Sequence, residues 1–321
     1  RWKRLYTEIA EVKGPYEQKK LWRIFAVWAI LKGIHLPTWI ELQETPTRRI
    51  KGRFDKLNKI RKFRESIPDW MDLIGLEELG EDQWGKELAS LNKMAPVIIR
   101  ANTLKTNVKE LQQTLISEDI ITEKINGHPD ALKLKERTNL FLKDSFQNGL
   151  YEVQDASSQL VAPFLKIKPG MKICDICAGA GGKTLHLSSL SENKGQIIAM
   201  DIYNNKLLEL KRRAKRNGAF NIETKAIENN KSFKRLYGKI DRLLIDSPCS
   251  GLGVLKRNPD SKWKLSSDFI ETIKNTQQEI LQKYAPLINN NGKLVYATCS
   301  ILPSENEIQI ENFLKSDLGM K

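Results

Sequence analysis

The spacing of hydrophobic and polar residues changes twice along the chain, and each change predicts a different kind of structure. Up to about residue 90, apolar residues recur at helical spacing, which predicts a helical region. Gly33 and Pro37 mark the end of one predicted helix in this region. That helix is predicted to be mostly buried through the apolar residues Leu21, Phe25, Val27, Trp28 and Leu31.

From Pro96 onward the pattern predicts a small α+β domain. The run from Val97 to Ala101 is rich in β-branched residues and is typical of a strand. Asn107 is suited to cap a helix that continues to about Ser117. Short strands are predicted near 120–125 and 131–135, and this domain is expected to end at Gly149.

The remaining sequence alternates between apolar strands and amphipathic helices. A strand and a helix cap are predicted at 151–155, ahead of a helix at 156–166. Further strands are predicted at 172–176, 196–201, 222–226, 241–246 and 293–298, and helices at 183–191, 204–216, 267–284 and 304–315. This alternation is typical of an α/β fold with a parallel, doubly wound, Rossmann-like sheet. We therefore predict three domains: 1–90 (helical), 91–150 (small α+β) and 151–321 (Rossmann-like).

Composition adds a preferred kind of partner. The chain of 321 residues carries a formal net charge of +14 and has a pI of about 9.5, which favours binding to polyanions such as nucleic acid. Residues 48–64 hold nine Lys or Arg and one acid. This run fits a solvated helix face and a phosphate-binding surface about equally well. The longest apolar stretch, 24–31, is far shorter than the roughly 20 residues that span a bilayer, so no membrane contact is expected.

The four cysteines are Cys174, Cys177, Cys249 and Cys299. Without a secretory signal, a chain of this size is expected to keep them reduced in the cytoplasm. Cys174 and Cys177 have the spacing of a zinc-binding pair, but a second cysteine pair and a nearby histidine pair are missing. We therefore predict that these two belong to a buried strand and that no metal is bound.

A glycine-rich turn predicts a nucleotide-type cofactor site. Gly179, Gly181 and Gly182 lie between a predicted strand and a predicted helix, where the backbone and the helix N-terminus can approach a ligand closely. Asp201 ends the next predicted strand, where an acid commonly binds ribose hydroxyls. A dinucleotide motif would need glycine at Thr184, and a P-loop would need glycine at Cys177. S-adenosylmethionine is the third possible ligand.

The other two cysteines favour S-adenosylmethionine. Cys249 follows the predicted strand that ends at Asp246, and Cys299 follows the predicted strand at 293–298. Ligands bind at the carboxyl ends of the strands in such sheets, so both thiols are placed to meet one substrate. Methylation of a pyrimidine carbon needs such thiols, whereas hydride transfer and phosphate hydrolysis do not.

Three motifs in order resemble the Sun (Fmu) family of RNA cytosine-5 methyltransferases, relatives of ribosomal-RNA small-subunit methyltransferase B. They are the cofactor turn at 175–184, Asp-Ser-Pro-Cys-Ser-Gly-Leu-Gly at 246–253 and Tyr-Ala-Thr-Cys-Ser at 296–300. Segments 100–105 and 153–159 also look like family segments, so the resemblance covers roughly 95–321. The sequence departs from the family at Gly179-Ala180, where Ala-Pro is usual, and at Ser247, where Ala is usual. The family's catalytic domain usually ends in a hairpin, which we expect to lie beyond Lys321.

The resemblance implies a covalent mechanism. A cysteine thiolate adds to carbon-6 of cytosine, so that carbon-5 can attack the methyl group of S-adenosylmethionine. Chemistry alone leaves the attacking cysteine open, because DNA cytosine methyltransferases use a Pro-Cys cysteine, which would be Cys249. The resemblance to the RNA family assigns attack to Cys299 and product release to Cys249, and it places Asp246 against the cofactor or the target base. The expected cofactor-binding residues are Cys177, Ala178, Gly179, Gly181, Gly182, Lys183, Asp201, Lys206, Glu228 and Asp246.

RNA is the expected partner, with ribosomal RNA favoured over transfer RNA and a monomer expected. The predicted contacts to the RNA backbone are Arg100, Asn102, Lys105, Lys256 and Arg257. Trp263 fits stacking on a base and a core position equally well. Two alternatives to this enzyme stay open, namely a P-loop NTPase and an inactive RNA-binding protein with the same fold.

Overall fold

The computed structural model describes residues 1–14, 17–43, 45–229 and 231–319, and the chain forms two compact units. The helical unit comprises Arg1–Met94, Ser250–Glu271 and Cys299–Ser304. The sheet unit comprises Ala95–Cys249, Thr272–Thr298 and Glu305–Lys321. The division into three domains that the sequence suggests stays a prediction.

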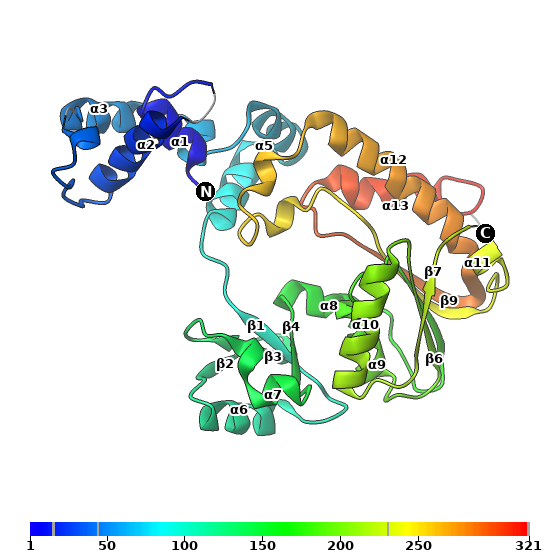
Figure 1. The fold of residues 1–321 in the computed structure, drawn as a ribbon. Coiled ribbons are helices and arrows are strands. Elements are labelled where there is room, and N and C mark those ends of the chain that lie inside the picture. Colours follow the sequence, from blue (N-terminus) through cyan, green and yellow to red (C-terminus); the bar gives the residue numbers. More distant parts are fainter. Residues whose placement is uncertain (15–16, 44, 230, 320–321) are drawn as a thin grey trace. The chain divides into compact units, whose positions relative to one another are not determined.

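The helical unit is built around two apolar clusters (Figure 1). Its helices are α1 (Lys3–Ile9), α2 (Gln18–Leu31), α3 (Thr47–Leu57), α4 (Arg61–Arg64) and α5 (Asp69–Leu91), with short 3-10 helices at Ile40–Leu42, Leu252–Val254 and Ser261–Trp263. Leu5, Ile9, Val27 and Ile50 join α1, α2 and α3 in the first cluster. In the second, residues of α5 pack with the two later segments of the unit, through Met71, Trp84, Leu88, Leu252, Leu255, Ile270 and Leu302.

Helix α2 is less buried than its sequence predicts. The helix is confirmed, but Leu21 is 52% exposed and Trp28 is 38% exposed. The aromatic side chains pack on one another at the surface instead, and the ring centroids of Phe25 and Trp28 lie 5.7 Å apart. The small residues Ala26 and Ala29 face the core together with Val27. The prediction is therefore wrong for Leu21 and Trp28.

The basic run at 48–64 is two helices, not one. Helix α3 ends at Leu57, and Ile60 is in an extended conformation before α4 begins. Ion pairs within the helical unit engage part of this run: Arg53 with Glu11, Arg61 with Asp72, Lys62 with Asp69 and Arg64 with Glu65.

The sheet unit contains the predicted small α+β structure. Four antiparallel strands have the order β2-β3-β1-β4 and are β1 (Ile98–Ala101), β2 (Thr122–Ile125), β3 (His128–Leu134) and β4 (Tyr151–Val153). Helices α6 (Val108–Ser117) and α7 (Asp144–Gln147) accompany them, and Leu140–Leu142 forms a 3-10 helix. Asn107 caps α6, since its side chain accepts a hydrogen bond from the Glu110 N–H. Ile99, Leu111, Leu132 and Tyr151 form the core of this part.

The same unit contains a larger, parallel sheet with strand order β7-β6-β5-β8-β9. Its strands are β5 (Lys172–Ile176), β6 (Gln196–Asp201), β7 (Ile222–Ala226), β8 (Ile240–Asp246) and β9 (Ile288–Ala297). These confirm the predicted strands, except that β9 begins before the predicted residue 293. Its first part contains an irregularity in pairing, and the sequence there, Asn-Asn-Asn-Gly, is more typical of a turn.

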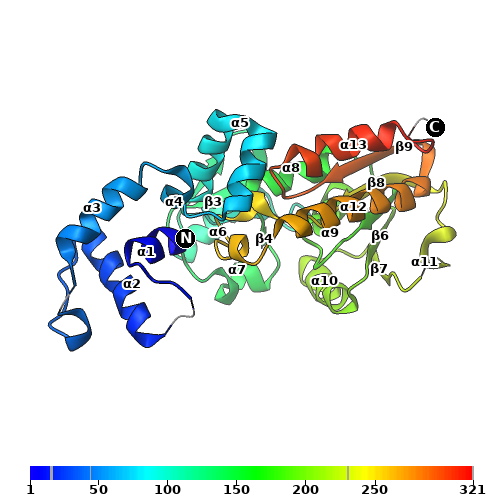
Figure 2. The same cartoon turned by 90° about the horizontal axis from the view of Figure 1, so that it is seen from above.

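Helices cover both faces of the parallel sheet (Figures 1 and 2). They are α8 (Ala156–Phe164), α9 (Gly182–Leu190), α10 (Asn204–Asn217), α11 (Lys231–Lys234), α13 (Glu307–Leu314) and the part of α12 (Ser267–Tyr284) from Thr272 onward, with a 3-10 helix at Ala285–Leu287. A further 3-10 helix, Pro303–Glu305, lies where the chain passes from one unit to the other. Side chains alternate along β5, so Cys174 packs on the face that meets α11, α12 and α13. Ile173 packs on the opposite face, against α8 and α9. This confirms the doubly wound, Rossmann-like fold.

The strand order reverses next to β5. From β5 the chain moves to β6 and β7 on one side, and it then returns to β8 and β9 on the other side. In open α/β sheets, ligands bind beyond the carboxyl ends of the strands at such a reversal. The glycine-rich turn after β5 and Asp246 at the end of β8 both lie at this point of the sheet.

Candidate functional site

The predicted cofactor turn links β5 to α9 and has an unusual backbone. Cys177, Gly179 and Gly181 all have positive φ, at 64°, 56° and 85°. A Cβ on Gly181 would lie 2.5 Å from Cγ of Leu210, so only glycine fits between the turn and α10. Gly182 then begins α9. The turn therefore brings backbone groups and a helix N-terminus to the carboxyl edge of the sheet, as a cofactor site requires.

Asp201 supports the turn from the end of β6. One carboxylate oxygen accepts a hydrogen bond from the Gly179 N–H (2.8 Å), and the other accepts one from the Tyr203 N–H (2.8 Å). Each oxygen can accept a further hydrogen bond, so the predicted contact with ribose hydroxyls is compatible with this role.

Lys183 and Asp246 meet in the structure. Lys183 Nζ lies 2.7 Å from an Asp246 carboxylate oxygen, and both side chains are partly exposed. This ion pair joins the first turn of α9 to the end of β8. Two residues that were predicted separately, 63 positions apart, therefore share one place at the strand reversal.

Asp175 is a further carboxyl group near the turn, and no role was predicted for it. Burial raises the pKa of Asp175 to about 7, although the Thr184 hydroxyl donates a hydrogen bond to one of its oxygens (2.6 Å). Its other oxygen is buried and has no hydrogen-bond partner among the described residues. Its position between apolar residues of a predicted strand is the sequence signal that could have identified it.

Lys206 and Glu228 are exposed. Lys206 Nζ lies 4.5 Å from the centroid of the Tyr203 ring, close to the end of β6. Glu228 follows the end of β7 by two residues, and Ala226 at that end pairs with Asp201. Both residues therefore belong to the carboxyl edge of the sheet, and their contacts with a cofactor stay predictions.

The four cysteines fall into two kinds. Cys174 is buried in β5, and burial raises the pKa of Cys177 to about 12, so both thiols stay protonated at neutral pH. Cys249 is half-buried and Cys299 is exposed. Cys299, the predicted nucleophile, is therefore the exposed one of the four cysteines, whereas Cys249 and Cys177 are both half-buried.

Their places along the chain follow from two neighbouring strands. Asp246 of β8 pairs with Ala297 of β9, and Cys249 and Cys299 follow these residues after three and two positions. In the sheet unit, the Gln277 side chain donates a hydrogen bond to the Pro248 carbonyl (3.0 Å) and so supports the segment before Cys249.

In the helical unit, two glycines make room for Cys299. The Gly253 N–H donates to the Cys299 carbonyl (2.9 Å), and a Cβ on Gly253 would lie 2.7 Å from that oxygen. A Cβ on Gly251 would lie 4.0 Å from the Cys299 sulfur. The Gly-Leu-Gly at the end of the first cysteine motif therefore packs against Cys299 of the second motif, and a side chain at Gly253 would collide with the Cys299 carbonyl.

Two of the predicted RNA contacts are wrong in this structure. Arg100 and Asn102 are each only 2% exposed. Arg100 donates to the Gln154 side chain and the Gly182 carbonyl. Asn102 donates to the carbonyls of Gly149 and Asn217. These hydrogen bonds go to protein atoms, and Arg100 Nε, which has no partner among the described residues, is buried, so neither side chain is presented to a phosphate.

The remaining predicted contacts reach the surface. Lys105 is exposed, although its Nζ donates to the carbonyls of Asn148 and Arg216. Arg257 is exposed and Lys256 is half-buried. Trp263 is half-buried, with Lys3 Nζ 5.3 Å from its ring centroid, so stacking on a base and a core position both stay open.

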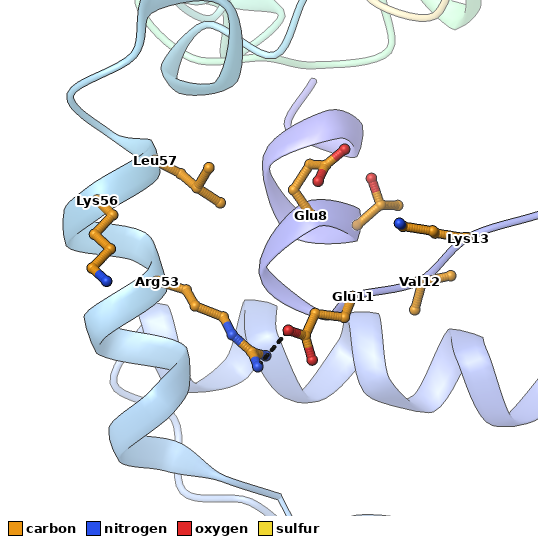
Figure 3. Close-up of a pocket in the computed structure, with 8 residues that line it drawn as sticks. Glu8, Glu11, Val12, Lys13, Arg53, Lys56 and Leu57 are labelled. Atoms are coloured by element: carbon orange, nitrogen blue, oxygen red, sulfur yellow. Dashed lines mark ion pairs between the residues drawn. The ribbon is translucent and has the colours of Figure 1, made fainter.

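Other features of the described residues indicate no second chemical centre. A pocket of about 360 Å³ in the helical unit is lined by residues of mixed charge, and Arg53 and Glu11 form an ion pair there at 2.6 Å (Figure 3). Within the described parts of the chain, no three His, Cys, Asp or Glu side chains are grouped to hold a metal ion. Across those same residues, no helix combines the length and apolar character that a membrane span needs.

Comparison with known proteins agrees with this geometry. Residues 162–320 match the family model "16S rRNA methyltransferase RsmB/F", and residues 67–140 match the "Methyltr_RsmF/B-like, ferredoxin-like domain". The solved methyltransferase homolog protein from Pyrococcus horikoshii is 27% identical, with a TM-score of 0.70 over 82% of each chain.

Curated relatives are more similar in sequence. The chain is 39% identical over 257 residues to a probable ribosomal RNA small subunit methyltransferase B of Synechocystis sp. (78% of this chain, 56% of the relative). It is 33% identical over 251 residues to the probable enzyme of the same name from Bacillus subtilis (78% of this chain, 55% of the relative). The chain thus spans about half the length of the curated relatives it matches.

The fold is that of the Rossmann-like methyltransferases. Within that class, the chain belongs to the RsmB/F family of methyltransferases, which confirms the resemblance inferred from the cysteine motifs and the turn.

Proposed function

We propose that this protein methylates carbon-5 of a cytosine in RNA, with S-adenosylmethionine as the methyl donor and Cys299 as the nucleophile. The observation that carries the proposal is the set of groups at the strand reversal: the turn after β5, Asp201, and the ion pair of Lys183 with Asp246. Cys249 and Cys299 follow the ends of the two neighbouring strands β8 and β9.

The residues of the turn fit S-adenosylmethionine. The ligand has an adenosine ribose and no phosphate, so it needs an acid for the ribose hydroxyls and close approach of the backbone. Asp201 and the glycines of the turn supply both. Lys183 and Asp246 add one charge of each sign beside the turn, which suits a ligand that carries an amino acid group and a sulfonium. When bound, S-adenosylmethionine supplies an electrophilic methyl group.

The protein's own residues then prepare the base. The Cys299 thiolate forms a bond to carbon-6, and the electron pair of the carbon-5–carbon-6 double bond becomes available at carbon-5 for bonding to the methyl group. A base removes the proton from carbon-5, the carbon–sulfur bond breaks and the double bond returns. We assign Cys249 to this release. Cys174 and Cys177 are unsuitable, because burial keeps their thiols protonated.

Asp246 is proposed to hold the target base. Aspartate oxygens accept hydrogen bonds from the exocyclic amine of cytosine, which uracil lacks. Lys183 engages one oxygen of Asp246, and the side chain is partly exposed. The carboxylate therefore offers a means to prefer cytosine over uracil.

We propose ribosomal RNA of the small subunit as the substrate. The names of the curated relatives state this substrate for those proteins, and the net charge of +14 favours a polyanion. Transfer RNA is the second RNA to test.

A methyl-transfer assay with labelled S-adenosylmethionine tests the proposal. The full chain is incubated with unmodified small-subunit ribosomal RNA, transfer RNA or single-stranded DNA, and the product nucleosides are separated. We expect label in 5-methylcytidine from ribosomal RNA. Label in another nucleoside would contradict the cytosine-5 chemistry, and ATP hydrolysis without methyl transfer would favour a P-loop NTPase instead.

A further inference from the structure

One face of helix α10 contacts the cofactor turn with two side chains. Leu210 packs against Gly181, where a Cβ would lie 2.5 Å from Leu210 Cγ. Arg213 lies three residues later on the same helix face. Its guanidinium donates a hydrogen bond to the Ala180 carbonyl (2.6 Å). Helix α10 therefore contacts two successive residues of the turn.

The same guanidinium contacts a buried acid of the small antiparallel sheet. Its second terminal nitrogen lies 2.8 Å from the carboxylate of Glu152 on β4. Glu152 is 3% exposed and also accepts hydrogen bonds from Arg216 and Asn217. Burial by itself would raise the pKa of Glu152, but the two arginines outweigh burial and the pKa is lowered. A buried carboxylate held in this way fixes the orientation of Arg213.

The small sheet contacts the turn at a second point. Arg100 on β1 pairs directly with Glu152 in the strand register, and it donates a hydrogen bond to the Gly182 carbonyl (3.1 Å). The carbonyls of Ala180 and Gly182, on either side of Gly181, therefore each accept a hydrogen bond from an arginine. One arginine belongs to the small sheet, and the other is oriented by it.

A turn with three positive φ angles and three glycines needs such support. Glycine has the greatest conformational freedom of all residues, so a ligand that binds a loose turn must first order it, and this weakens binding. Hydrogen bonds to the carbonyls order the turn before the ligand arrives and leave its N–H groups to other partners.

We propose that Arg213 is a positioning residue that holds the cofactor turn ready for its ligand, with Glu152 of the small sheet orienting the guanidinium. This inference rests on the proposed binding of S-adenosylmethionine to the turn. It assigns the small sheet a role in cofactor affinity in addition to any contact with RNA.

Calorimetric titration of S-adenosylmethionine into the full chain tests the inference. The informative variants are Arg213→Gln, which loses both contacts, and Arg213→Lys, which keeps a charge near Glu152 without donating to both groups. Arg216→Gln is the matched control, because Arg216 binds the same carboxylate and no hydrogen bond from it to the turn is seen among the described residues. Arg212→Gln is a surface control, since Arg212 is exposed and pairs with Glu209.

We expect Arg213→Gln to raise the dissociation constant about tenfold, the effect of one charge-assisted hydrogen bond. Arg213→Lys should show a smaller increase, and Arg216→Gln and Arg212→Gln should stay within about twofold of the wild type. In methyl transfer, the Arg213 variants should raise KM for S-adenosylmethionine more than they lower kcat. Melting temperatures without ligand show whether each variant folds, and if Arg213→Gln does not fold, Arg213→Lys decides the question.

Two results would overturn the inference alone. They are wild-type affinity in a folded Arg213 variant, and an equal loss of affinity in Arg216→Gln, which would indicate general stabilisation rather than positioning. A wild-type chain that fails to bind S-adenosylmethionine would instead remove the proposed function, and this inference with it.

Discussion

At the scale of single residues, the site combines groups that motifs reveal with groups that only folding brings together. Asp201 and Asp246 could be predicted because each ends a predicted strand, and Lys183 could be predicted because it follows the glycines of the turn. Arg213 and Glu152 could not, because they lie 61 positions apart and meet only when α10 packs near β4. Local sequence also gives no sign of burial, which is why Arg100 looked like a contact for RNA although it is enclosed.

Asp175 gives a prediction about pH. Its pKa is about 7 in the folded protein against 3.8 for the ordinary group, so between these values the folded state holds a proton that the unfolded state has lost. The contribution of Asp175 to the free energy of unfolding therefore falls as the pH rises from about 4 to about 7, and the total decrease is about 4 kcal/mol at most. Asp175→Asn removes the penalty and keeps an oxygen that can accept from Thr184.

Urea unfolding of wild type and Asp175→Asn at pH 5 and pH 8 checks this prediction. The variant should gain stability relative to the wild type on going from pH 5 to pH 8. A difference between the two proteins that does not change with pH would show that Asp175 is not protonated when folded.

At the scale of elements, the hydrophobic pattern predicts the parallel sheet well. The strands β5, β6 and β7 have the predicted bounds. In β6 the signal is a nearly continuous apolar run, which is typical of a buried parallel strand, whereas the edge strand β7 is mostly polar and only partly buried. The hydrophobic pattern does not predict the start of β9 or the break between α3 and α4. The Asn-rich start of β9 is typical of a turn, and the basic run at 48–64 has no glycine or proline at the break before α4.

The packing of the cofactor turn against α10 gives a second prediction. Gly181→Ala should destabilise the protein by about 1–3 kcal/mol, because the new methyl group meets Leu210 and φ is positive. The matched control is Gly182→Ala, since Gly182 is helical and a Cβ there would meet no side chain of the described residues within 4 Å. Equal stability of the two variants in urea unfolding would contradict the close contact of the turn with α10.

At the scale of the whole molecule, the net charge of +14 predicts binding to RNA. In the basic run at 48–64, the structure shows that some of the cationic side chains form ion pairs and others are exposed. Lys51, Lys56 and Lys59 are exposed, whereas Arg53, Arg61, Lys62 and Arg64 form ion pairs. We expect the three exposed lysines to contact phosphates.

The triple variant of Lys51, Lys56 and Lys59 to Ala should therefore bind RNA more weakly and with a smaller dependence on salt. Loss of three phosphate contacts should lower the slope of log affinity against log salt by about 2 to 3. Filter binding over a range of salt concentrations measures the slope, and the melting temperature serves as the control for folding. An unchanged slope would favour a solvated helix face.

The central claim is that Cys299 forms the covalent bond to cytosine and that Cys249 releases it. The most direct measurement is denaturing electrophoresis of the full chain after reaction with RNA and S-adenosylmethionine, for the wild type, Cys249→Ala, Cys299→Ala and the double variant. We predict a denaturation-resistant protein–RNA adduct in Cys249→Ala, and neither adduct nor methyl transfer in Cys299→Ala or the double variant. An adduct that persists in Cys299→Ala and disappears in Cys249→Ala would contradict the account and reverse the two roles.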